Sequence, residues 1–138
     1  MFILETFKMD RKIISTAAFF GMTAIILGAF GAHALKKVLT LEELVSFETG
    51  VRYQMYHALF LLFIGLTNHL SAKTKKTIVA LTILGVMLFS GSIYLLSTMR
   101  ISEINFKVIG FVTPIGGALL IFAWGILAFQ FTKKKDKI

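Results

Sequence analysis

Apolar residues dominate four segments of the chain, and short polar stretches separate them. The segments are roughly Ile13–Ala34, Val51–Leu70, Thr77–Ser97 and Lys107–Phe131. Each is close to the roughly 20 residues that a helix needs to cross a hydrocarbon core about 30 Å thick. The pattern therefore predicts an all-α fold, an integral membrane four-helix transmembrane bundle that forms a single domain over residues 1–138.

The first connection, residues 35–50, is amphipathic. Apolar and charged residues alternate along it: Leu39, Leu41, Leu44, Val45 and Phe47 against Lys36, Lys37, Glu42, Glu43 and Glu48. Segments of this kind lie in the plane of the membrane interface. We therefore expect a short interfacial helix in this loop. The second connection, residues 71–76, is predicted to be a tight turn that carries Lys73, Lys75 and Lys76.

Composition supports a membrane location. Hydrophobic residues make up 57% of the chain and charged residues only 16%, whereas soluble domains carry about 25% charged residues. The formal net charge of +8 could suggest nucleic-acid binding, but the basic residues flank the apolar runs, as topology determinants do. The expected partner is therefore the lipid bilayer, and no nucleic acid.

The basic residues also predict an orientation. One side of the bundle receives ten of them: Lys8, Arg11, Lys12, Lys73, Lys75, Lys76, Lys133, Lys134, Lys135 and Lys137. The other side receives five: Lys36, Lys37, Arg52, Arg100 and Lys107. Cytoplasmic loops are enriched in Lys and Arg, so we expect both termini on the cytoplasmic side of an inner or plasma membrane. The first apolar run is longer than the roughly 7–15 residues of a signal peptide's hydrophobic region, and we interpret it as a retained span.

Small residues recur every three or four positions in the first span, at Ala17, Gly21, Ala24, Gly28 and Ala32. Helices in lipid associate through close packing at such stripes, because lipid supplies no hydrophobic drive between them. Two interpretations stay open. The stripe packs inside one bundle, which we favour, or it joins copies of the chain into a homo-oligomer.

The second span opens with a polar arc. Glu48, Arg52 and Tyr56 form one helical ridge, and Thr49, Tyr53 and His57 form the next. The opposite side is apolar and could face lipid: Val51, Met55, Ala58, Leu59 and Leu62. We therefore expect the polar arc to face the bundle interior or the interface. His57 lies roughly 10 Å beyond Gly50 along the axis, and ionisable groups at such depth indicate function.

Antiparallel spans would bring other polar residues to the level of this arc, in the outer half of the bundle. The candidate ligand-binding residues are His33, Glu48, Arg52, Tyr53, Gln54, Tyr56, His57, Tyr94 and Thr113. Arg52 is the expected anchor for an anionic group, because a guanidinium binds carboxylate or phosphate through two parallel hydrogen bonds. The tyrosines would line the pocket, with His57 as its deepest polar group. The alternative, which we favour, is that the cluster only holds the helices together.

Other functional classes have less support from the sequence. A small transporter or channel subunit would need polar residues in the inner half, where the sequence has few. His33 and His57 could ligate haem or begin a metal site, although their different depths argue against it. There is no cysteine, no glycine-rich phosphate loop and no nucleophile motif. We therefore expect no catalytic residue, metal or cofactor, and an unidentified small ligand, lipid headgroup or partner if the cluster binds anything.

Several motifs resemble a known family. They are residues 28–35 (GAFGAHAL), 47–62, 89–96 (FSGSIYLL) and 113–117 (TPIGG). Together they are similar to the small membrane-protein family that includes bacterial YgdD and YwdK and human transmembrane protein 256. The resemblance covers nearly the whole chain except about the first ten residues. It implies a compact four-helix inner-membrane protein, and it carries no established activity.

Overall fold

The computed structural model describes residues 2–132, and the side chains of all of these except residues 2, 3, 5 and 6. Every element in this range is helical, which confirms the all-α fold. The elements are α1 (Phe2–His33), η1 (Leu35–Lys37), α2 (Leu41–Leu66), α3 (Ala72–Ser97), α4 (Met99–Ser102), η2 (Lys107–Ile109) and α5 (Val112–Thr132).

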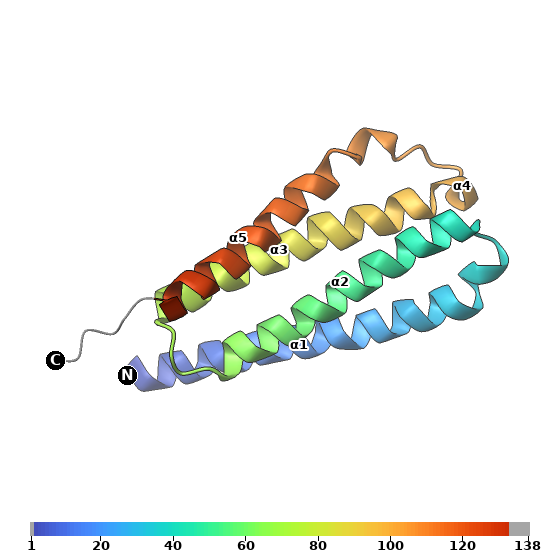
Figure 1. Cartoon of the computed structure of the whole chain (residues 1–138). Coiled ribbons are helices and arrows are strands. Elements are labelled where there is room, and N and C mark those ends of the chain that lie inside the picture. Colours follow the sequence, from blue (N-terminus) through green and yellow to red (C-terminus); the bar gives the residue numbers. More distant parts are fainter. Residues whose placement is uncertain (1, 133–138) are drawn as a thin grey trace.

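The four long helices lie side by side and alternate in direction (Figure 1). α2 packs against α1 and α3, and α3 packs against α5. One end of the bundle therefore holds the start of α1, the α2–α3 connection and the end of α5. We call it the basic end, because Lys8, Arg11, Lys12 and Lys73 lie there; the opposite end, which holds η1 and α4, is the α4 end.

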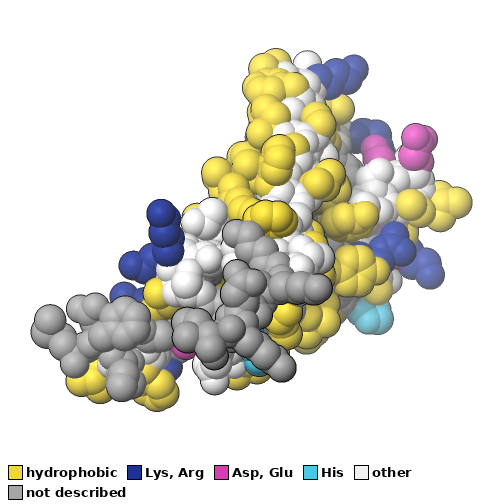
Figure 2. All heavy atoms as spheres, turned by 60° about the vertical axis from the view of Figure 1, so that its left-hand side comes forward, with side chains coloured by type: hydrophobic (Ala, Val, Ile, Leu, Met, Phe, Trp, Pro, Cys, Tyr) yellow, Lys and Arg dark blue, Asp and Glu magenta, His cyan; other side chains and the backbone are white. Residues whose placement is uncertain are grey.

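Three helical stretches in the described residues are long and apolar enough to cross a membrane: Phe7–Lys37, Ala72–Ser97 and Lys107–Thr132. Figure 2 shows hydrophobic side chains over much of the visible flank and Lys and Arg side chains towards the ends. α2 is not among the three, because the polar residues from Arg52 to His57 reduce its hydropathy.

The prediction of a short interfacial helix within residues 35–50 is wrong. After η1, α2 begins at Leu41 and runs without a break to Leu66. A capping box starts it: Thr40 Oγ1 accepts from the backbone N–H of Glu43 (3.2 Å), and the Glu43 carboxylate accepts from the backbone N–H of Thr40 (2.8 Å). Gly50 does not end the helix but lets α3 approach, since a Cβ there would lie 2.8 Å from the Tyr94 ring.

The small-residue stripe of α1 packs against α2 within the chain. Ala17 and Ala24 are buried, and a Cβ on Gly28 would lie 3.4 Å from Val51 Cγ1. Ala58, on the side of α2 that could face lipid, is instead buried against this stripe. The small residues on α1 let α2 approach closely, so the apolar side of α2 with Val51 and Ala58 packs against them.

The Lys75 side chain is buried in the first turns of α3, whereas the sequence predicted a tight turn over residues 71–76. The Ser71 hydroxyl caps α3 by accepting from the backbone N–H of Thr74, so α3 already begins at Ala72. Lys75 is only 2% exposed, and its Nζ lies 2.7 Å from Oδ1 of Asp10 on α1. The ion pair joins the first turns of α3 to α1. Four of the basic residues assigned to the cytoplasmic side lie outside the described residues: Lys133, Lys134, Lys135 and Lys137.

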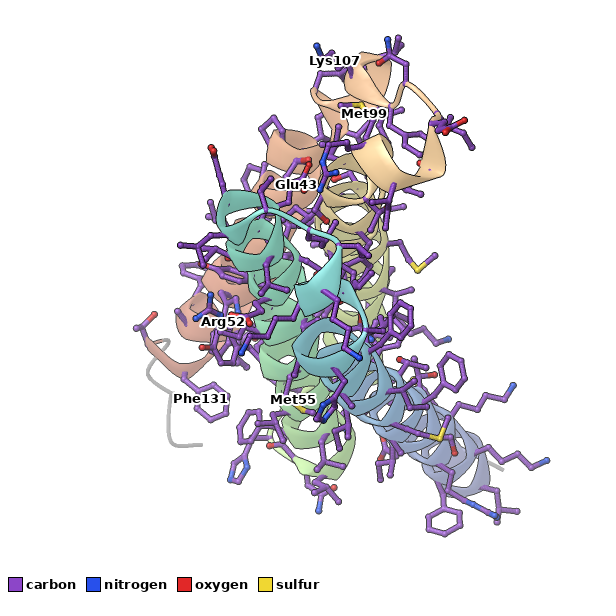
Figure 3. All side chains as sticks on the ribbon, turned by 90° about the vertical axis from the view of Figure 1, so that its right-hand side faces the viewer. Glu43, Arg52, Met55, Met99, Lys107 and Phe131 are labelled. Atoms are coloured by element: carbon purple, nitrogen blue, oxygen red, sulfur yellow. The ribbon has the colours of Figure 1, made fainter. Side chains whose placement is uncertain are left out.

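At the α4 end, Arg100 holds the α3–α5 connection against the start of α2. Its Nε and Nη2 donate to the Glu43 carboxylate at 3.0 and 2.9 Å, and Nη2 also donates to the Val38 carbonyl. Figure 3 looks onto this end, where Glu43, Met99 and Lys107 are labelled. The bonds from Arg100 and the Thr40 N–H lower the pKa of Glu43 to about 2, so the carboxylate stays ionised in ordinary buffers.

The contact between α3 and α5 depends on Gly116. A Cβ at this position would lie 2.8 Å from the Leu88 carbonyl carbon and closer still to the Phe89 nitrogen, both rigid backbone atoms. Gly125, about two and a half turns further along α5, has open space around it. Gly116→Ala should therefore lower stability by about 1–3 kcal/mol through overpacking, while Gly125→Ala should not. Thermal unfolding in one detergent measures both. Equal melting temperatures for the two variants would contradict this packing.

Candidate functional site

Gln54 joins three helices through one buried carboxamide. Its side chain is 7% exposed. Nε2 donates to the Phe20 carbonyl (3.0 Å) and to Thr23 Oγ1 (2.7 Å) on α1, and Oε1 accepts from the Tyr94 hydroxyl (2.8 Å) on α3. All the strong donors and acceptors of the amide are therefore used inside the bundle, as a polar group in hydrocarbon requires.

His57 lies one turn deeper and joins α2 to α5. Its ring is 4% exposed. Nδ1 lies 2.7 Å from the Tyr53 carbonyl, and Nε2 accepts from Trp124 Nε1–H at 3.2 Å. Because the indole is only a donor and the carbonyl only an acceptor, the pair requires a neutral imidazole with its proton on Nδ1. Both ring nitrogens are engaged, so His57 positions Trp124 rather than offering a free ligand atom.

A groove opens beside this pair, between α2, α3 and α5. Its volume is about 480 Å³, within the range of about 300–1,000 Å³ typical of ligand pockets. The lining is mostly apolar and aromatic: Tyr53, His57, Phe89, Gly117, Leu120, Ile121 and Trp124. The Tyr53 ring contacts the Phe89 ring at a centroid distance of 4.9 Å. The groove therefore offers a long apolar wall with two polar residues along one side.

Two further hydrogen bonds fix the helices around the groove. Ser90 Oγ donates to the Gly50 carbonyl (2.8 Å), which joins α3 to α2. The hydroxyls of Ser92 and Thr113 lie 2.6 Å apart and join α3 to the start of α5. Thr113 is thus part of the helix-joining network, and does not line the groove.

The remaining candidate residues point outwards. His33 is exposed at the end of α1, and Glu48, Arg52 and Tyr56 are exposed on α2. Glu48 and Arg52 form no ion pair among the described side chains; the Arg52 guanidinium makes only a 3.4 Å contact with Thr49 Oγ1. Figure 3 places Arg52 on the side of α2 away from α1. From the sequence, the ridge of Glu48, Arg52 and Tyr56 was expected to face inward with the other polar residues. In the structure this ridge is exposed, whereas Gln54 and His57 are buried.

The sequence interpretation missed Trp124. It is the single tryptophan of the chain, and it lies well inside α5 rather than at a membrane interface, where tryptophans are enriched. An indole N–H in that position needs an acceptor, so the position itself was a usable signal. The carbonyl of Phe20 could not have been found this way, because every residue carries one.

The two histidines proposed as a ligand pair do not come together. His33 lies at the α4 end with an exposed side chain, while both nitrogens of His57 are bonded to other groups. Within residues 2–132, no group of three or more His, Cys, Asp or Glu side chains is placed to hold a metal ion.

Long apolar helices, with buried polar side chains at their contacts, define a small helical membrane protein. The comparisons with known proteins agree. Residues 27–117 match the family described as "Protein of unknown function (DUF423)". The chain belongs to this family, and the resemblance to YgdD and YwdK inferred from its motifs is confirmed.

Three relatives illustrate the similarity. A UPF0382 membrane protein of Haemophilus influenzae is 34% identical over 93% of this chain and 99% of its own length. The UPF0382 membrane protein YwdK of Bacillus subtilis is 40% identical over 83% and 90%. The UPF0382 inner membrane protein YgdD of Escherichia coli is 33% identical over 93% and 95%. No solved structure matches the chain.

The Gln54–Tyr94 bond can be tested by removing one hydroxyl. Tyr94→Phe keeps the ring against Phe47 but leaves Gln54 Oε1 without its donor, and should cost about 0.6–2 kcal/mol of stability. Tyr56→Phe is the matched control, because the exposed Tyr56 hydroxyl has no hydrogen-bond partner among the described residues. Thermal unfolding in detergent compares them, and equal loss in both variants would argue against a structural role for the Gln54 amide.

Proposed function

We propose that the protein crosses the membrane four times, with the basic end in the cytoplasm. α2 contains 26 residues, roughly 39 Å at 1.5 Å per residue, which is enough to cross. It lies antiparallel between α1 and α3, and both of those helices qualify as spans. Short connections at both ends leave α2 no route other than across the bilayer. The excess of Lys and Arg at the basic end supports its cytoplasmic location.

Single cysteines test this topology directly, because the chain has none of its own. Lys36→Cys, Lys73→Cys and Lys107→Cys each replace an exposed lysine. In intact cells, an impermeant maleimide should label positions 36 and 107 from outside and position 73 only after lysis. Labelling of positions 36 and 73 from the same side would show that α2 does not cross, and labelling of position 73 alone in intact cells would reverse the orientation.

We further propose that the protein is a non-enzymatic binding protein for an amphiphilic small molecule or lipid. The groove between α2, α3 and α5 carries this proposal. Its aromatic and aliphatic lining suits a hydrocarbon or flat apolar group. Its walls are held by His57–Trp124 and Gln54–Tyr94, so the shape does not depend on the ligand. A preformed pocket loses less entropy on binding.

The charged part of such a ligand would lie near Arg52. This residue precedes Tyr53, which lines the groove. Tyr56 lies one turn further along the ridge of Arg52, and its ring is 5.7 Å from that of Tyr53 at the centroids. Glu48 does not neutralise its guanidinium in the structure. An exposed Arg next to a residue that lines an apolar groove fits an anionic group at the membrane interface. His33 and Thr113 have no part in this proposal, because the first is distant and the second is bonded to Ser92.

Native mass spectrometry of gently extracted protein tests the groove. Gly117 lines it, and a Cβ there would meet only the Phe89 ring at 3.5 Å, so Gly117→Leu should fill the groove while the bundle stays folded. Gly125→Leu adds the same side chain into open space on the same helix. We expect a defined adduct on the wild type and on Gly125→Leu, and its loss on Gly117→Leu.

Arg52→Ala separates binding from folding at the same site. We expect it to weaken adduct retention about tenfold or more, the effect of losing a charge-assisted bond of roughly 1.5–3 kcal/mol, with an unchanged melting temperature. Lys36→Ala, an exposed lysine at the same end, is the control. A clean apo mass for the wild type, or equal retention by Gly117→Leu, would reject the binding function and leave the polar cluster with its structural role.

A further inference from the structure

A second groove runs between α1 and α3 at the basic end, and it shares no lining residue with the groove described above. Its volume is about 360 Å³. The lining from α1 is Met9, Lys12, Ile13 and Thr16, and the lining from α3 is Lys76, Val79, Ala80 and Ile83. Both sets follow helical spacing on one face. The ion pair between the buried Lys75 and the partly exposed Asp10 joins the same two helices near this groove.

Apart from Met9, the apolar residues of this groove lie deeper in the bundle than its two lysines. α1 and α3 run in the same direction from the basic end (Figure 1). On α3, Lys76 comes first and Ile83 lies seven residues further in, roughly 10 Å along the axis. On α1, Met9 and Lys12 come before Ile13 and Thr16. The groove therefore has a mouth with two ammonium groups and an apolar floor that continues into the hydrocarbon region.

Nothing in the described structure neutralises those two ammonium groups. Asp10, the acidic side chain nearest in sequence to Lys12, is engaged by Lys75. Lys12 and Lys76 form no ion pair with any described side chain. A hollow of about 570 Å³ adjoins the mouth, shares Lys12 with the groove and adds Lys8 and Arg11. Its described lining contains no acidic residue either.

We propose that this groove binds one anionic phospholipid. The phosphate would lie between Lys12 and Lys76, and an acyl chain would run along Ile13, Val79 and Ile83. Lys is a point-charge ligand for phosphate, and basic pockets between transmembrane helices on the cytoplasmic side bind anionic headgroups. A free phosphate ion would not need the apolar floor, and a zwitterionic lipid would not need the two unpaired lysines.

Native mass spectrometry from nanodiscs with equal phosphatidylglycerol and phosphatidylcholine tests the site. We expect the wild type to retain one phosphatidylglycerol in preference to phosphatidylcholine. Lys12→Gln/Lys76→Gln should lower that preference about tenfold or more, at about 1 kcal/mol per lysine. Lys36→Gln/Lys37→Gln removes the same charge at the α4 end and should change the preference less than about twofold. Lys12→Arg/Lys76→Arg should preserve it.

The apolar floor has its own variant. Ala80 lines the groove and is exposed, so Ala80→Phe should displace the retained phosphatidylglycerol without changing any charge. Gly117→Leu should leave this lipid in place, which distinguishes the site from the groove near Trp124. Three results would overturn the proposal: no preference in the wild type, equal loss in Lys36→Gln/Lys37→Gln, or an adduct with the mass of inorganic phosphate in place of the lipid.

Discussion

A buried carboxamide must find hydrogen-bond partners inside the protein when lipid surrounds it, and Gln54 finds them on two neighbouring helices. Its bonds to Phe20 and Thr23 fix α2 against α1, and the bond from Tyr94 fixes α2 against α3. One turn further along, His57 extends the same logic to α5 through Trp124. Every other long helix is thus tied to α2 by a polar contact, and the groove beside Trp124 exists because these contacts set the spacing of its walls.

Small residues provide the complementary constraint. Polar side chains join the helices at a few points. Between those points, the size of the residues in contact sets the distance between the helix axes. Gly28 and its neighbours bring α1 close to α2, and Gly116 lets the backbones of α5 and α3 nearly touch. α2 and α5 have no such glycine contact. They meet through the aromatic rings of Phe60 and Trp124, 4.2 Å apart at their centroids, and the wider spacing leaves the groove open.

The helical class and the approximate segments could be predicted from hydropathy, because period and length are local properties. The contacts between helices were harder to predict from the sequence. Thr49, Tyr53 and His57 share a ridge with no sign in the sequence of which ones turn inward, and Arg52 was assigned to the inward set although it is exposed. The position of Gln54 depends on where α1 and α3 lie around α2. The burial of Lys75 depends on an aspartate 65 positions away, a pairing that spacing cannot reveal.

The polarity that makes α2 the connecting helix also makes it the least able to enter a bilayer alone. α1, α3 and α5 are apolar enough to span by themselves, whereas α2 is not. Burying Gln54 and His57 without partners would cost several kcal/mol for each group. The cost falls once α1 is beside α2, because Phe20 and Thr23 already satisfy the Gln54 amide N–H groups. α1 and α2 are joined by a short connection, so α2 has that partner from the start. In the proposed four-span topology, the hairpin α1–α2 is therefore the unit whose insertion into lipid is favourable, rather than α2 alone.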